Sequence, residues 1–256
     1  MSLIIEHDGP VTIVTIDRPQ ARNAVNPETA LALRAAFKDF DNDDGQSVAI
    51  LTGSEGAFCA GYDLKSVAAR GGDVNSKPGD EGAMGPTRML LSKPVIAAVE
   101  GHAVSGGLEL ALWCDMRVAS TSAIFGVYCR RWGVPLIDGG TIRLPRLIGH
   151  SRALDMIMTG RGVGAEEALT FGLANRLVPA GEALATATEL AHEIAKFPQL
   201  CMRADRASSY DQWSLELPQA LHHEAEGGEI PRKMEAPLGA ARFAAGKGRG
   251  GDFNSI

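Results

Sequence analysis

The sequence of 256 residues lacks the features that mark several classes of protein. Its four cysteines form no CxxC pair and no regular spacing, so we predict neither a disulfide framework nor a metal site. Apolar runs such as PVIAAV at 94–99 are too short to cross a bilayer, which argues against a membrane protein. The formal net charge is −6 and the basic residues are dispersed, which argues against a nucleic-acid partner.

The start of the sequence, MSLIIEHDGP, has neither a basic segment nor a cleavable apolar core. We therefore expect no secretory signal, reduced thiols and a cytoplasmic location. Hydrophobic residues make up 45% of the chain, enough for one large α/β domain, alone or with an appendage.

Strand and helix signals alternate along the first half of the chain, which is typical of βαβ units. The pattern predicts strands in 2–17, with a turn at 8–10, and then at 47–53, 94–101 and 114–120. It predicts helices at 27–43 and after residue 106, and a mostly helical chain from residue 139, interrupted at 172–180. The polar, glycine-rich segment 70–86 is either a mobile lid over a site or a surface loop of no consequence.

Glycines occur at strand-to-helix junctions in three segments: GSEGAFCAGYDL (53–64), GHAVSGGLEL (101–110) and the stretch 125–149. At such junctions free peptide N–H groups can receive negative charge. The second segment also places a carboxyl, Glu109, about one turn into a helix among apolar residues. Donors for an oxyanion beside an acid or base are what enolate chemistry needs.

At these residues the sequence resembles the crotonase superfamily, the enoyl-CoA hydratase/isomerase family. FCAGYDL and KPVIAAVEGHAVSGGLELALWCD carry the resemblance, and GGT, LPRLIG, TGR and GLANRLVP follow in the family's order. The resemblance implies an α/β fold with a ββα spiral core over 1–200 and a helical region over 201–256 that serves packing and oligomerisation. It also implies an acyl-CoA substrate, no cofactor beyond the CoA of that substrate, and a homotrimer or hexamer.

The resemblance also assigns roles to residues. The thioester oxygen is expected between the N–H groups of Ala60 and Gly106, and Glu109 matches the first hydratase glutamate. For Glu109 the alternative is a carboxyl that caps a peptide N–H near a helix start. The expected CoA contacts are Arg22, Ala24, Ala60, Asp63, Leu64, Phe243 and Lys247. A solvated surface charge is the alternative for Arg22, and an ordinary frayed terminus is the alternative for Lys247.

The main departure from the family pattern is Cys129, which stands where the second hydratase glutamate is expected. An unperturbed thiol pKa near 8.5 makes cysteine a poor substitute for a proton-shuttling carboxyl, so Cys129 is read as a small buried filler. Asp138, directly before GGT, is the predicted partner of Glu109 as an acid/base pair, with an N-cap of the following helix as the alternative. Arg130 and Arg131 are expected either to bind a carboxylated acyl chain or to form structural ion pairs.

Three functions therefore stay open at this point. The enzyme is expected to hydrate enoyl-CoA or to isomerise the double bond of an enoyl- or dienoyl-CoA. The remaining alternative is a non-catalytic binding protein with the same fold.

Overall fold

The structure, a computed structural model, describes residues 2–71 and 82–253 of the chain. It divides the chain into two compact units, residues 1–191 and 192–256. The division falls inside helix α7 (Ala183–Ala195), earlier than the boundary after residue 200 that the sequence suggests. Most of the predicted lid, residues 72–81, lies outside the described residues.

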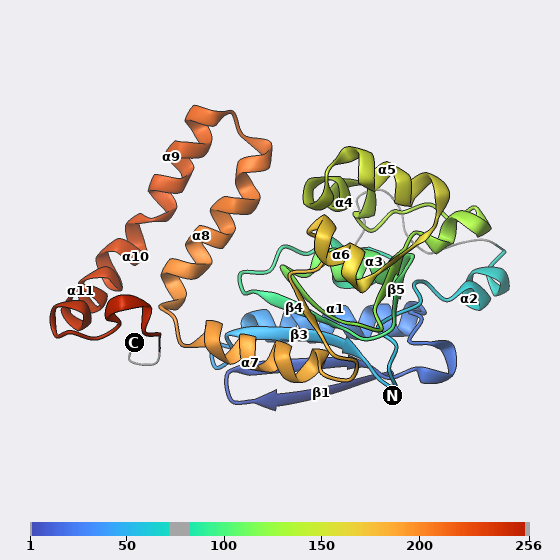
Figure 1. Cartoon of the computed structure of the whole chain (residues 1–256), viewed down its shortest axis with the longest axis horizontal. Coiled ribbons are helices and arrows are strands. Elements are labelled where there is room, and N and C mark those ends of the chain that lie inside the picture. Colours follow the sequence, from blue (N-terminus) through green and yellow to red (C-terminus); the bar gives the residue numbers. More distant parts are fainter. Residues whose placement is uncertain (1, 72–81, 254–256) are drawn as a thin grey trace. The chain divides into compact units, whose positions relative to one another are not determined.

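The first unit is built on a sheet of six strands in the order β1-β2-β3-β4-β6-β9 (Figure 1). Only the β1–β2 pair is antiparallel, and the other pairs run parallel. The six strands are β1 (Leu3–Asp8), β2 (Val11–Ile16), β3 (Val48–Gly53), β4 (Val95–Val99), β6 (Met116–Ser120) and β9 (Arg176–Val178). Nearly every residue of β3 and β4 is buried, as expected for central parallel strands.

A second, smaller sheet contains β5 (His102–Val104), β7 (Ile124–Gly126) and β8 (Gly162–Gly164). The helices of the first unit are α1 (Pro27–Asn42), α2 (Leu64–Ala69), α3 (Gly106–Trp113), α4 (Gly140–Ile148), α5 (His150–Thr159), α6 (Ala165–Phe171) and most of α7. The α/β class and the helical C-terminal region expected from the sequence are confirmed. The predicted hairpin turn is present at Gly9, and Asn26 caps α1 by accepting a hydrogen bond from the Thr29 N–H.

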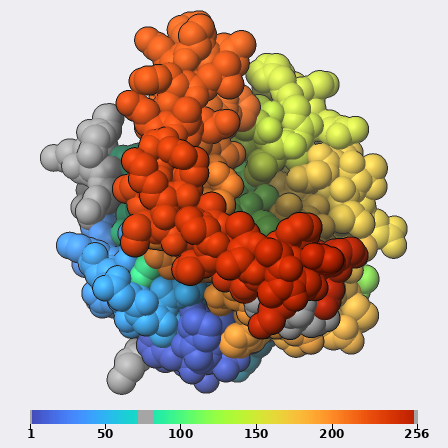
Figure 2. Space-filling view, turned by 90° about the vertical axis from the view of Figure 1, so that its left-hand side faces the viewer, coloured from blue at the N-terminus to red at the C-terminus, as the bar shows by residue number. Residues whose placement is uncertain are grey.

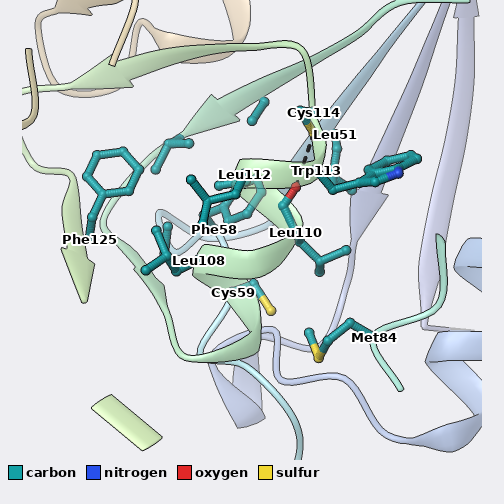
Figure 3. Close-up of a cluster of buried hydrophobic side chains, with 14 of the residues drawn as sticks. Leu51, Phe58, Cys59, Met84, Leu108, Leu110, Leu112, Trp113, Cys114 and Phe125 are labelled. Carbon is teal, nitrogen blue, oxygen red and sulfur yellow. Dashed lines mark hydrogen bonds between the residues drawn. The ribbon is translucent and has the colours of Figure 1, made fainter. Parts of the chain in front are cut away.

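Helix α3 is buried on all sides, which sets it apart from the amphipathic α1. All eight of its residues are buried, and Leu108, Leu110 and Leu112 lie in the central apolar cluster (Figure 3). At its C-terminal end, the buried Arg117 donates hydrogen bonds to the carbonyls of Ala111 and Leu173, which fixes that end in the core.

The first turn of α3 lies against the segment before α2. A Cβ built on Gly107 would stand 2.0 Å from the carbonyl oxygen of Cys59, and one on Gly106 would stand 2.5 Å from Sδ of Met84. Glycine at 107 is therefore a packing requirement, whereas at 106 the contact is with the flexible side chain of Met84. Ser105, just before the helix, has φ = 56°, a conformation that side chains rarely adopt.

The second unit consists of the end of α7 and the helices α8 (Gln199–Asp211), α9 (Leu217–Gly227), α10 (Glu229–Met234) and α11 (Ala236–Ala244). Helices α8 and α9 lie side by side (Figure 1), and α9 to α11 form the orange and red surface of Figure 2. Large apolar side chains are exposed on these helices: Leu217, Leu221, Ile230, Met234, Leu238 and Phe243. Among the described helices, none is long and apolar enough to cross a membrane.

The contact at Gly107 yields a test of the fold. Gly107→Ala should lower the free energy of unfolding by about 3 kcal/mol, because the peptide backbone at Cys59 cannot move aside as a side chain would. Gly164→Ala is the matched control, since a Cβ there meets no atom within 4 Å and should change stability little. Urea unfolding of the two variants measures the difference, and equal stabilities would contradict this account of the packing.

Candidate active site

A cavity of about 340 Å³ opens beside the first turn of α3. Its walls come from the 60–64 segment, the residues around the α3 start, the 3-10 helix η3 (Tyr128–Trp132) and the loop that leads to α4. Six of the residues predicted from the sequence line it: Arg22, Ala60, Leu64, Gly106, Glu109 and Asp138. The chain thus brings the two predicted carboxyls and the Gly106 turn into one cavity, although 29 residues separate Glu109 from Asp138.

The Glu109 carboxyl binds peptide N–H groups at the start of α4, not at the start of its own helix α3. Its side chain is 3% exposed, and Oε1 accepts hydrogen bonds of 2.9 Å from the N–H groups of both Asp138 and Gly140. Because Gly140 is the first residue of α4, the carboxyl meets the positive end of that helix. The capping alternative is therefore realised in part, but across two elements.

The pKa of Glu109 is raised from 4.5 to about 7, mainly because burial disfavours the charged form. The negative charge of Asp138 raises it further, while the N–H groups of Gly140 and Asp138 and the charge of Arg143 lower it. Glu109 is therefore balanced between its two protonation states near neutral pH, where it can either take or give a proton.

Asp138 is also buried, with 2% of its surface exposed, but it is not the N-cap of α4. Gly139 occupies the cap position and has no side chain that could cap the helix. Instead, Oδ1 of Asp138 accepts hydrogen bonds from the Met84 N–H at 3.1 Å and from the Thr87 hydroxyl. The structural role open to this carboxyl is therefore to hold the 82–88 segment against the cavity.

Arg143 of α4 reinforces the same junction. Its guanidinium donates to the carbonyls of Asp138 at 3.0 Å and of Thr87 at 2.7 Å. The sequence did not single out Met84 or Thr87, because Met84 lies in the polar segment 70–86, read as either a mobile lid or a surface loop, and Thr87 follows it. Residues 82–87 are in fact buried and form part of the cavity wall at Ala83 and Met84.

The two predicted oxyanion donors differ in their surroundings. Gly106 is the first residue of α3, so its N–H has no acceptor within that helix. The Ala60 N–H, by contrast, donates to the carbonyl of Arg22 at 3.0 Å. Gly61 follows with φ = +98° and turns the chain so closely past Gly106 that a Cβ on Gly61 would stand 2.9 Å from the Gly106 nitrogen.

Tyr62 is a further cavity residue that the sequence did not single out. The Val25 N–H donates to the Gly61 carbonyl, and the Asp63 N–H donates to the Val25 carbonyl. In such a parallel pairing the residue between the two bonds directs its own peptide groups to the opposite side. The Tyr62 N–H therefore points away from Val25.

The predicted CoA contacts of the first unit fall into two groups. Arg22 and Leu64 are exposed and line the cavity. Asp63 caps α2 and forms a 3.1 Å ion pair with Arg18, whose guanidinium also donates to the carbonyl of Ala24. Asp63 and Ala24 thus support the cavity wall without lining it.

Phe243 and Lys247 belong to the second unit. Phe243 is 62% exposed, with the Arg249 guanidinium 5.4 Å from its ring centre, and the Lys247 N–H donates to the Arg242 carbonyl. Their expected contact with CoA stays a prediction.

Cys129 lines the cavity and is 5% exposed. Burial raises the pKa of its thiol, and the charge of Glu109 acts in the same direction, while a hydrogen bond with the Ser105 side chain opposes them. The thiol is therefore protonated at neutral pH, as expected of a buried filler. No group of three or more candidate metal ligands occurs among the described residues.

Comparison with known proteins agrees with the resemblance seen in the sequence. The family model described as enoyl-CoA hydratase/isomerase matches residues 6–235. The chain is 40% identical over 211 residues to the enoyl-CoA hydratase EchA19 of Mycobacterium tuberculosis, covering 78% of this chain and 77% of that protein. It is 41% identical over 205 residues to the carnitinyl-CoA dehydratase of Salmonella typhi, covering 79% and 78%.

Solved structures give the same result. The crystal structure of enoyl-CoA hydratase EchA1 from Mycobacterium marinum superposes with a TM-score of 0.89 at 36% identity, covering 95% of this chain and 96% of that one. An enoyl-CoA hydratase from Bacillus anthracis superposes with a TM-score of 0.86 at 30% identity, covering 96% of both chains.

The raised pKa of Glu109 makes stability depend on pH. Between pH 4.5 and about 7 the unfolded chain has lost this proton while the folded chain keeps it, so the fold loses stability as the pH rises. The loss attributable to Glu109 should reach about 3 kcal/mol by pH 8. Urea unfolding at pH 5 and pH 8 should show a smaller loss in Glu109→Gln than in the parent protein.

Two further variants sharpen this measurement. Asp138→Asn should end the loss at a lower pH, because it removes the negative charge that raises the Glu109 pKa. The exposed Glu166→Gln is the control and should follow the parent protein. The assignment is wrong if Glu109→Gln and the parent protein lose the same stability between the two pH values.

Proposed function

Since the chain belongs to the enoyl-CoA hydratase/isomerase family, we propose that it acts on an acyl-CoA thioester through an enolate, with Glu109 and Asp138 as the acid/base pair. The observation that carries this proposal is the burial of both carboxyls in one cavity beside the Gly106 turn. The intact turn and the net charge of −6 favour an enzyme over a nucleic-acid-binding relative of the same fold. The CoA belongs to the substrate, and no separate cofactor is proposed.

In hydration, a water oxygen adds to the β-carbon of the enoyl group and a proton reaches the α-carbon, and dehydration is the reverse. Negative charge develops on the thioester oxygen in the intermediate. Glu109 is proposed to take the proton of the attacking water, a role supported by its pKa near 7. The pair shares one proton, and Asp138 is proposed to carry it at the start of hydration and to give it to the α-carbon as Glu109 takes the proton of water. In dehydration the ionised Asp138 takes the α-proton and protonated Glu109 gives its proton to the leaving hydroxyl group, and the Thr87 hydroxyl donates a hydrogen bond to Asp138.

Isomerisation of the double bond is the second candidate, and Cys129 favours it. If Cys129 occupies the place of the second hydratase glutamate, its buried, protonated thiol cannot activate water. Moving a double bond requires only that a proton leave one carbon and return to another, and two carboxyls on one side of the cavity suffice. Both reactions share the enolate, so the pair Glu109 and Asp138 serves either one.

The oxyanion donors are proposed to be Gly106 and a peptide group of the 60–62 turn. The sequence assigns Ala60, but its N–H already donates to Arg22. Tyr62 is the better candidate, since its N–H points away from Val25 and the residue lines the cavity. Each preorganised donor contributes roughly 3 kcal/mol in comparable sites.

The homotrimer or hexamer and the cytoplasmic location remain proposals. The exposed apolar side chains on α9, α10 and α11 support assembly, because a monomer would leave them in water.

Turnover of crotonyl-, 3-enoyl- and dienoyl-CoA, with product identification, tests the reaction and its subclass. Glu109→Gln and Asp138→Asn should each lower kcat by about 10²–10⁴-fold, the usual contribution of a positioned acid or base. Cys129→Ala is the control and should be nearly silent, because its thiol only fills space. If Asp138→Asn turns over every substrate at the parental rate, Asp138 has only a structural role and the proposed acid/base pair is wrong.

The oxyanion donors are tested by removing N–H groups. Gly106→Pro and Tyr62→Pro should each lower kcat/KM by at least about 10²-fold. Gly106→Ala keeps the N–H and crowds only the flexible Met84 side chain, so it should retain more activity than Gly106→Pro. Equal activity of Gly106→Pro and the parent enzyme would rule out this donor, and circular dichroism confirms that each variant is folded.

A further inference from the structure

The two adjacent arginines of η3 have different surroundings. Arg130 does not line the cavity, and its Nε donates to the carbonyl of Ile157 at 2.9 Å. Arg131 lines the cavity beside Trp132 and Val134. The two roles expected from the sequence, ion pairing and recognition of an acyl chain, therefore need not be the same for Arg130 and Arg131.

Arg131 is supported by an aromatic platform. Its guanidinium carbon lies 4.6 Å from the ring centre of Tyr128 and 5.9 Å from that of Trp132, and its Nε lies 3.4 Å from the Tyr128 carbonyl oxygen. Residues three apart in a 3-10 helix lie on the same face, which explains the stacking of Arg131 on Tyr128. Stacking restricts the guanidinium while leaving N–H donors for a ligand.

The Tyr128 ring lies against two glycines, which leave room for it. Gly126 and Gly162 face each other across the β7–β8 ladder. A Cβ on Gly126 would stand 2.6 Å from Cε1 of Tyr128, and one on Gly162 would stand 2.8 Å from its hydroxyl oxygen. The ring thus fills the space that two side chains would otherwise occupy, and His102 meets its edge with ring centres 6.3 Å apart.

The charge of Arg131 is not used within the described part of the chain. The ion pairs there include those of Arg18, Arg161, His222, His223, Arg232 and Lys233, and none involves Arg131. Within the residues that the structure describes, Arg131 therefore does not serve a structural ion pair. A restrained guanidinium at the wall of a substrate cavity is suited to bind a planar carboxylate through two parallel hydrogen bonds.

We propose that Arg131 is a specificity residue that selects acyl groups ending in a carboxylate, so that the substrate is the CoA thioester of a dicarboxylic acid. This proposal rests on the acyl-CoA activity proposed above. The thioester end lies at Gly106 and Glu109, and the distal carboxylate lies at the guanidinium of Arg131. The apolar cavity residues Val134, Pro135 and Ile137 suit the methylene groups between the two ends.

Binding of unreactive saturated thioesters tests this proposal without requiring turnover. Glutaryl-CoA and pentanoyl-CoA have acyl chains of equal length and differ in a terminal carboxylate against a methyl group. Calorimetry should give a Kd about tenfold lower for glutaryl-CoA, a typical effect of a charge-assisted hydrogen bond. The preference should shrink as salt is added, and the 4-(trimethylammonio)butanoyl thioester should bind more weakly than pentanoyl-CoA.

Variants assign the preference to one side chain. Arg131→Leu should raise the Kd of glutaryl-CoA about tenfold relative to that of pentanoyl-CoA and so abolish the preference, and Arg131→Lys should retain part of the preference. Arg130→Leu is the matched control and should keep the parental preference. If Arg131→Leu weakens both ligands equally, Arg131 binds the CoA moiety and the proposal is wrong.

The two proposals fail in distinguishable ways. Equal binding of glutaryl-CoA and pentanoyl-CoA by the parent protein overturns the role of Arg131 and leaves the acyl-CoA activity intact. Binding of neither thioester, together with no turnover of crotonyl-CoA, overturns the proposed function and this inference with it.

Discussion

The close approach of the first turn of α3 to the Cys59–Gly61 segment is the constraint on which the site depends. Two glycines make it possible, since a Cβ on Gly61 would stand 2.9 Å from the Gly106 nitrogen and one on Gly107 would stand 2.0 Å from the Cys59 carbonyl oxygen. This approach brings the start of a buried helix to the cavity, where the N–H of its first residue has no acceptor within the helix and a carboxyl follows one turn further on. Ser105 adopts a left-handed φ at the same point, a strain that the surrounding core has to maintain.

A second consequence is that Glu109 is buried without losing its ability to titrate. Burial alone would keep the carboxyl protonated, and the two peptide N–H groups at the start of α4 together with Arg143 offset this effect in part. The junction between α3 and α4 thus sets the proton affinity of the site. Asp138 contributes twice to that junction, through its N–H, which donates to Glu109, and through its negative charge, which raises the Glu109 pKa.

Short sequence patterns predict much of this fold. Strand 48–53, helix 27–42 and the glycine junctions follow from patterns only a few residues long, and the burial of Glu109 follows from its apolar neighbours in sequence. Contacts between distant segments were not predictable. The Met84 and Thr87 bonds to Asp138 span more than 50 residues, and the Ala60 bond to Arg22 depends on how two irregular segments pair. The N-cap alternative for Asp138 rested on its neighbours in sequence. In the structure the Asp138 carboxyl instead binds the distant residues Met84 and Thr87.

The two ends of the cavity respond differently to sequence change, because they are built differently. The buried end relies on peptide groups and buried carboxyls, and replacing Gly107 there would force a side chain against the backbone of Cys59. The far wall at η3 relies on exposed side chains such as Arg131 and Trp132, which can change without moving the main chain. Interactions at the exposed wall are weakened by solvent, whereas those around Glu109 are strengthened by burial. A chain of this design can therefore keep the buried end of the cavity unchanged while the side chains of η3 vary.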